Sequence, residues 1–97
     1  LVARVVDGDA VRLKALASAI ASQPGHAALL VSRTSPVLAV VARAADLTLR
    51  SDQVVSALVK RFNGKGGGKP DLAQCGSLQG EPDVVLAAAL EALSSPS

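Results

Sequence analysis

A stretch rich in glycine and lysine, FNGKGGGKPDLAQCG from Phe62 to Gly76, holds the residues best suited to binding chemistry. Five of the chain's eight glycines lie in it, beside Lys65 and Lys69. Glycine loses much conformational entropy when it is ordered, so a run of it marks a place where only bare backbone fits. Bare backbone flanked by ammonium groups can approach a phosphate closely. The stretch therefore suggests a phosphate cradle, a close contact between helices or a flexible linker.

Positive charge is concentrated around the same stretch. No acidic residue occurs between Asp52 and Asp71, whereas four basic residues do: Lys60, Arg61, Lys65 and Lys69. The net charge of the whole chain is only +2, so these residues form a positive patch on a nearly neutral body. Such a patch is typical of a protein with a phosphate-bearing partner. The alternative is a solvated rim that keeps the glycine stretch soluble.

Two known phosphate-binding motifs do not fit the spacing. A P-loop needs a glycine, four further residues and then Gly-Lys-Ser/Thr, whose hydroxyl binds magnesium. Here Pro70 follows Lys69, and Asn63 stands at the first glycine position. A dinucleotide-binding GxGxxG motif follows a strand, whereas this chain has Lys69 in place of the third glycine and a predicted helix before it. Neither nucleotide-binding motif is present.

Groups that could catalyse a reaction or bind a metal are scarce. His26 follows a turn without an acid or nucleophile near it in the sequence, and Cys75 is best explained as a small packed residue. These two soft ligands fall short of the four that a structural zinc site needs. Asp71, directly after Pro70, is better placed to order a turn than to act as a base. We therefore predict no catalytic residue and no metal site.

Length and composition predict one globular domain over residues 1–97. No apolar run approaches the roughly 20 residues that span a bilayer, and no secretory signal opens the chain, so we expect no membrane partner. A single cysteine excludes an internal disulfide and fits a reducing compartment. We expect a cytoplasmic location and leave an organellar one open. Because the chain does not begin with Met, we expect it to be a fragment of a longer polypeptide.

The first half of the chain predicts a strand, a helix and a hairpin. Residues 3–6 suit a short buried strand, and Asp7-Gly8-Asp9 suits a helix start. A helix should follow until Gln23-Pro24-Gly25 ends it. Its predicted buried stripe is Leu13, Leu16, Ala17 and Ile20, with Arg12 and Lys14 facing water. The apolar runs 27–32 and 37–42, joined by a turn at 33–36, predict a hairpin covered on both faces.

The second half predicts two helices around the glycine loop. Ser51 should cap the first, which Asn63-Gly64 should end; its predicted buried stripe is Val55, Leu58, Val59 and Phe62. Residues 72–75 could add a strand, and Pro82 should begin the last helix before a frayed end at 94–97. That helix should bury Leu86, Ala89, Leu90 and Leu93. The order β-α-β-β-α-(β)-α predicts an α/β fold, a small mixed sheet packed with helices.

The stretch NGKGGGKPDLAQCGS resembles the GGKGGGRPDMAQAGG signature of the C-Ala domain, the C-terminal domain of alanyl-tRNA synthetases, which belongs to the DHHA1 group. The predicted order of elements resembles that group over essentially the whole chain. The departures from the signature include Asn63 and Ser77, which stand where the family has glycine, and Cys75, which stands where it has alanine. Asn63 should keep the bend because asparagine tolerates positive φ. The positions carried over from the signature are Gly64, Lys65, Gly66, Gly67, Gly68, Lys69 (where the signature has arginine), Pro70, Asp71, Ala73, Gln74 and Gly76.

The resemblance implies a DHHA1-like fold and a non-catalytic module that binds the elbow of tRNA(Ala) and aids aminoacylation and editing. It implies contacts with other domains of the synthetase, and a homodimer through a helical segment that this chain is too short to contain. The domain itself should need no cofactor, whereas the parent would use ATP, magnesium and a zinc-bearing editing domain. The tRNA-binding residues that we expect are Lys60 and Arg61, from the positive patch, and Lys65, Gly66, Gly67, Gly68, Lys69 and Gln74, from the signature. The implied structural residues of the loop are Asn63, Gly64, Pro70, Asp71, Ala73 and Gly76.

Other roles stay open at this point. DHH-type phosphoesterases carry a similar loop with GGGHP, where this chain has Lys69 before Pro70. A freestanding alanyl-tRNA editing protein and a structural or dimerisation domain are further alternatives. Readers of single-stranded RNA need several aromatic rings on which bases stack, and this chain has one, Phe62. We therefore expect recognition of RNA shape and backbone, unless the glycines serve only to pack two helices closely.

Overall fold

The computed structural model describes residues 2–33, 37–44 and 50–94, with side chains up to residue 92. Its centre is a five-stranded sheet in the order β1-β2-β3-β5-β4. β1 (Val2–Val6) pairs in parallel with β2 (Ala27–Ser32), and every other pairing is antiparallel. The remaining strands are β3 (Val37–Arg43), β5 (Leu72–Leu78) and β4 (Lys65–Gly68). The predicted mixed sheet is confirmed.

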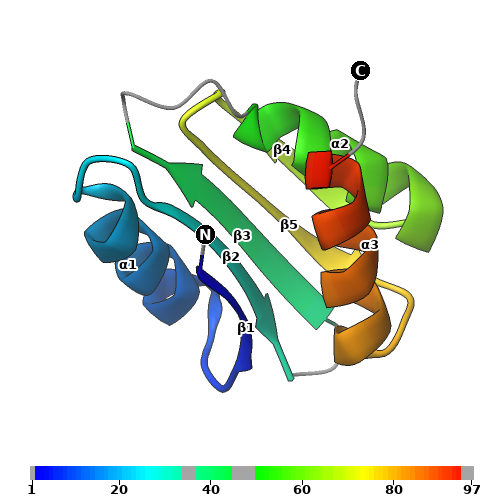
Figure 1. The fold of residues 1–97 in the computed structure, drawn as a ribbon. Coiled ribbons are helices and arrows are strands. Elements are labelled where there is room, and N and C mark those ends of the chain that lie inside the picture. The colour runs from blue at the N-terminus through cyan, green and yellow to red at the C-terminus, as the bar shows by residue number, and fades with distance from the viewer. Residues whose placement is uncertain (1, 34–36, 45–49, 95–97) are drawn as a thin grey trace.

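Helices cover both faces of the sheet (Figure 1). α1 (Ala10–Ala21) packs on one face against β2 and β3, and α2 (Ser51–Phe62) and α3 (Pro82–Ser94) pack on the other. The two faces therefore bury separate hydrophobic clusters, one around Leu13 and one around Leu58. Because both faces are covered, every residue of β2 is buried, as its unbroken apolar run predicts. The architecture is the predicted α/β fold.

The start of α1 confirms the expected cap, but its buried stripe is narrower than predicted. An Asp9 side-chain oxygen accepts a hydrogen bond from the Arg12 backbone N–H at 2.9 Å. Leu13 and Ala17 are fully buried, whereas Leu16 is 39% exposed. The prediction for Leu16 is therefore wrong, because α1 lies across two strands and buries only the residues that point straight at them.

For α2, the predicted N-cap is wrong and the predicted C-terminal end is confirmed. Ser51 is the first helical residue and is buried, and Arg50 occupies the position before it. Ser51 therefore does not cap the helix; its N–H donates to the Pro70 carbonyl at 2.9 Å instead. At the other end Asn63 adopts the left-handed conformation, with φ 54° and ψ 42°, which ends the helix as predicted.

The last helix begins at Pro82, as predicted. Ala89 is buried and Leu90 half-buried, and Val85 and Ala88 add buried contacts that the spacing did not single out. The side chain of Leu93, the turn at 34–36 and the tail at 95–97 lie outside the described residues. Within the described part of the chain, no helix is long and apolar enough to cross a membrane.

The glycine stretch differs most from the prediction. Residues 65–68 form the edge strand β4 instead of a loop, and β5 runs to Leu78 instead of residue 75. The turn between them is confined to Lys69-Pro70-Asp71, where the backbone N–H of Lys69 donates to the Leu72 carbonyl at 2.9 Å. The glycines therefore belong to a β-hairpin at the edge of the sheet.

Candidate nucleic-acid interface

Gly66 and Gly68 allow β4 to approach β5 closely. A Cβ atom added at Gly66 would lie 2.3 Å from the Gln74 carbonyl oxygen, and one at Gly68 would lie 2.5 Å from the Ala73 Cα atom. At Gly67, between them, no atom lies within 4 Å of the position that a Cβ atom would occupy. The bare backbone at 66 and 68 is therefore a requirement of strand pairing. Helix packing does not explain it, since the atoms that would be struck belong to β5.

Gly80, outside the signature and two residues before α3, packs closely against α2. A Cβ atom there would lie 2.8 Å from a ring carbon of Phe62 in α2 and 3.6 Å from a methyl carbon of Val85 in α3. Only the distance to Phe62 is too short for a Cβ atom, so Gly80 lets the segment before α3 lie against the Phe62 ring.

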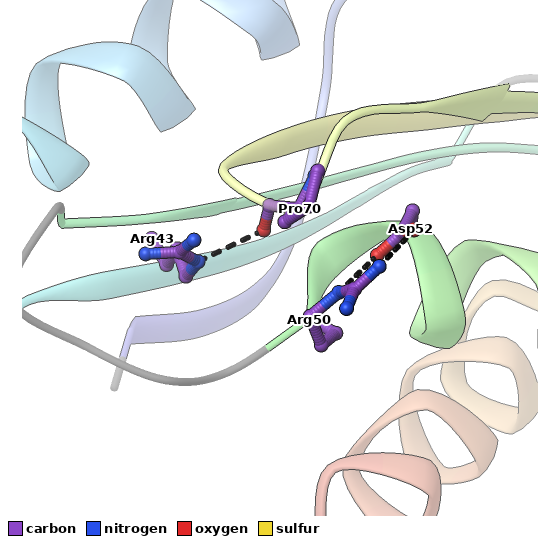
Figure 2. Close-up of polar contacts among 4 residues, drawn as sticks. All are labelled: Arg43, Arg50, Asp52 and Pro70. Carbon is purple, nitrogen blue, oxygen red and sulfur yellow. Dashed lines mark hydrogen bonds and ion pairs between the residues drawn. The ribbon is translucent and has the colours of Figure 1, made fainter.

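The turn of the hairpin is tied to the rest of the fold through the Pro70 carbonyl. This oxygen accepts hydrogen bonds from the Ser51 N–H at 2.9 Å and from Arg43 Nε at 3.0 Å, and Figure 2 shows the Arg43 side chain reaching it. The backbone N–H of Arg43 also donates to the Asp71 carbonyl at 2.9 Å. The position of Lys69, the first residue of the turn, is therefore fixed by β3 and the start of α2. Arg43 could not be predicted from the sequence, because no motif marks it.

A groove lies between α1 and this hairpin, on the face of β4 and β5 that α1 leaves uncovered. It consists of two hollows of about 400 Å³ and about 160 Å³, with Gln74 lining both. We call the two together the hairpin groove. The larger hollow is lined by Lys14, Gly67, Gly68, Lys69, Asp71, Leu72, Ala73 and Gln74. The smaller one is lined by Ala10, Leu38, Val40, Lys65, Gly66, Gln74, Cys75 and Gly76.

The lysines of the hairpin groove have no acidic partner within the described part of the chain. Lys14, Lys65 and Lys69 are exposed, and none forms an ion pair with another described residue. The arginines are more engaged: Arg33 lies 3.6 Å from Asp7, Arg50 pairs with Asp52 at 3.0 Å (Figure 2), and Arg43 bonds to carbonyls. The Arg50 guanidinium, which donates to Asp52, lowers the pKa of that carboxyl group. The ammonium groups of the groove therefore remain available to an anionic partner.

Two of the predicted binding residues lie elsewhere. Lys60 and Arg61 belong to α2, which covers the opposite face of the sheet from the groove. Arg61 lies 3.5 Å from Glu91 of α3, and its guanidinium carbon lies 5.8 Å from the centroid of the Phe62 ring. The structure therefore brings together Lys65, Lys69 and Gln74 but not Lys60 and Arg61. It adds Lys14, which the sequence analysis assigned only to the solvent-facing side of a helix.

Among the described residues, His26 and Cys75 are not arranged for catalysis or metal binding. His26 hydrogen-bonds to the Pro24 carbonyl at 3.0 Å on the surface. Among the residues that the structure describes, no group of three His, Cys, Asp or Glu side chains could hold a metal ion. Cys75 is buried in the cluster between the sheet and α2. Burial raises the pKa of its thiol from 9.0 to about 11, so the nucleophilic thiolate is scarce at neutral pH.

This buried thiol predicts a stability that falls at high pH. The folded chain holds the thiol proton more tightly than the unfolded chain does. Below pH 9 the thiol is protonated in both states, so its titration should leave the free energy of unfolding unchanged. The free energy of unfolding should then fall by about 2 kcal/mol as the pH rises from about 9 to 11. Urea unfolding across this range tests it, with Cys75→Ala as the control that lacks the fall. Equal pH profiles for the two proteins would contradict the assignment.

Comparisons with known proteins agree with this fold. Residues 1–95 match the family model described as the DHHA1 domain. Among solved structures, the chain is similar to the C-Ala domain from Aquifex aeolicus alanyl-tRNA synthetase, with a TM-score of 0.79 and 22% sequence identity over 95% of this chain and 88% of that one. At this identity the likeness shows the fold and does not fix the parent protein. No curated protein sequence matches. Because the family model covers nearly all of its residues, the chain belongs to the DHHA1 domain family.

Proposed function

We propose that this chain is a non-catalytic tRNA-binding module of the C-Ala type, which contacts the elbow of tRNA(Ala) as the C-terminal part of an alanyl-tRNA synthetase. Membership of the DHHA1 family and the likeness to a C-Ala domain support the proposal. The observation that carries it is the hairpin groove, where Lys14, Lys65 and Lys69 lie without ion pairs among the described residues. In this role the module holds one tRNA within reach of both the aminoacylation and the editing centres. ATP, magnesium and zinc would belong to other domains of the parent.

The chemistry of the groove favours the sugar-phosphate backbone over the bases. Lysines supply the charge that phosphate contacts need, and such contacts position a protein without reading sequence. Bases of single-stranded RNA stack on aromatic rings, yet the only aromatic residue, Phe62, is 8% exposed and lies in the core. A folded RNA, which presents closely spaced phosphates on a rigid surface, therefore suits this domain better than a single strand.

Removing two charges from the groove tests the proposal. The double variant Lys65→Ala/Lys69→Ala should bind a tRNA(Ala) transcript about tenfold more weakly, since each exposed charge contact contributes up to about 1 kcal/mol. The plot of log affinity against log salt concentration should also become less steep by about 1.5, because each lost phosphate contact removes roughly 0.7 to 0.9. Fluorescence anisotropy with labelled tRNA between about 50 and 200 mM KCl measures both quantities.

A matched control removes the same charge at the opposite edge of the sheet. Arg4 lies in β1, the edge strand farthest from β4, and the exposed Arg33 hydrogen-bonds through its backbone N–H to Val6 of β1. Arg4→Ala/Arg33→Ala should keep nearly the wild-type affinity and salt dependence. Equal losses in both double variants would mean that net charge alone attracts the RNA, and no binding by the wild-type chain would remove the proposal.

A further inference from the structure

The wall of the hairpin groove opposite β4 is formed by α1, a helix distant from the glycine signature in the sequence. Lys14 projects from this helix and lines the larger hollow together with Lys69, the first residue of the hairpin turn. Both positions are held firmly. Leu13 and Ala17, on either side of Lys14 along α1, are fully buried against the sheet, and the Pro70 carbonyl anchors the turn. Two ammonium groups therefore line one hollow from independent elements.

The charge in the groove is unbalanced in favour of an anion. Asp71 is the one acidic residue lining either hollow, where Lys14, Lys65 and Lys69 are the basic ones. Asp71 is exposed and forms no ion pair with another residue of the described ranges. A phosphate entering the larger hollow would therefore meet a net charge of +1, from Lys14 and Lys69 against Asp71, and Lys65 adds a further positive charge from the smaller hollow.

Gln74 sits where the two hollows meet. It faces the groove from β5 and is exposed, amid Leu38, Val40 and Leu72, whose side chains offer no hydrogen bond. Its amide carries both a donor and an acceptor. The ribose 2′-hydroxyl needs both, and it is the group by which a protein distinguishes RNA from DNA.

We infer that the hairpin groove holds one segment of RNA sugar-phosphate backbone, with Lys14 and Lys69 binding phosphate from opposite walls and Gln74 hydrogen-bonding a ribose 2′-hydroxyl. The inference rests on the proposed function and deepens it, since it adds a contact from α1 and a basis for choosing RNA. The size agrees, because about 400 Å³ is near the lower end for ligand pockets, and Gly67 lets the segment lie against bare backbone.

The first test is a charge comparison within α1. Lys14→Ala should weaken binding of a tRNA(Ala) transcript by about fivefold, and should make the log–log salt dependence less steep by about 0.8. Arg12→Ala removes the same charge from an exposed position two residues away that does not line the groove. It should leave binding within twofold of wild type. Wild-type affinity for Lys14→Ala, or equal losses for both variants, would overturn the inference.

The second test compares RNA with DNA. Gln74→Leu keeps an apolar stem and removes both hydrogen-bonding groups, so the ratio of affinities for the tRNA transcript and a DNA oligonucleotide of the same sequence should fall about fivefold. Urea unfolding shows whether the variant is folded, and the Gln74 side-chain amide signals in ¹⁵N NMR should shift when RNA is added to wild type. An unchanged RNA:DNA ratio would overturn the inference.

The two proposals fail in different ways. If Lys65→Ala/Lys69→Ala weakens binding while Lys14→Ala and Gln74→Leu behave as wild type, the chain binds tRNA through the hairpin lysines, and the contacts inferred for Lys14 and Gln74 are wrong. If wild type binds no tRNA, both proposals are wrong.

Discussion

Replacing Gly66 or Gly68 with alanine is expected to lower the free energy of unfolding by about 3 kcal/mol, whereas Gly67→Ala should leave it unchanged or raise it slightly. The added carbon at 66 would overlap the Gln74 carbonyl oxygen and the Cys75 Cα atom, at 2.3 and 2.5 Å. At 68 it would overlap the Ala73 Cα atom and the Leu72 carbonyl oxygen, at 2.5 and 2.6 Å. These obstacles are backbone atoms of a paired strand, so no side-chain rotation relieves them.

Gly67 is the matched control for this experiment. It lies in the same strand and is equally exposed, but no atom lies within 4 Å of the position that its Cβ would occupy. Urea denaturation of the three alanine variants gives the free energies, and hydrogen exchange of the β4 and β5 amides shows whether the loss arises in the hairpin. If Gly66→Ala and Gly67→Ala unfold at the same urea concentration, the glycines are not required for strand pairing.

This result would separate two reasons for a glycine-rich signature. Gly66 and Gly68 are explained by the fold alone, so their presence says little about a ligand. Gly67 is not explained by packing, and it lines the larger hollow of the groove. If a Gly67→Ala variant is stable but binds tRNA less tightly, RNA comes close to the backbone at this position.

Much of the fold could be predicted because periodicity and end signals act locally. Apolar spacing reported the buried sides of α2 and α3, and Asp9, Asn63 and Pro82 marked helix ends through their own backbone or side-chain chemistry. β4 could not be recognised in this way. Strands are usually identified by β-branched and aromatic residues, and KGGG has neither; its extended form comes from hydrogen bonds to β5.

The candidate site could be predicted only where it is contiguous in sequence. Lys65, Lys69 and Gln74 belong to one signature and do line one groove. Lys60 and Arg61 were grouped with them by proximity in the chain, but the left-handed turn at Asn63 separates α2 from the hairpin. Lys14 and Arg43 come from distant elements, and nothing in their neighbouring residues indicates that the fold brings them to the hairpin.

Replacing Phe62 with alanine is expected to lower the free energy of unfolding by about 3 kcal/mol, near the lower end of the usual range for such a change. The ring is the largest side chain of the cluster between the sheet and α2. Phe62 is the last residue of α2, and its ring packs against Gly80. The loss is a large fraction of the stability of a domain of this size.

Phe62→Leu is the variant that connects this residue to function. It keeps most of the buried volume, so the free energy of unfolding should fall by only about 1.5 kcal/mol, and the affinity for a tRNA(Ala) transcript should match wild type. The reason is that the ring is 8% exposed and lies on the α2 side of the sheet, away from the groove. Urea unfolding and anisotropy on the same preparations measure both quantities. A Phe62→Leu protein that is folded but binds tRNA several-fold more weakly would show that the ring stacks on a base, and recognition of backbone alone would then be wrong.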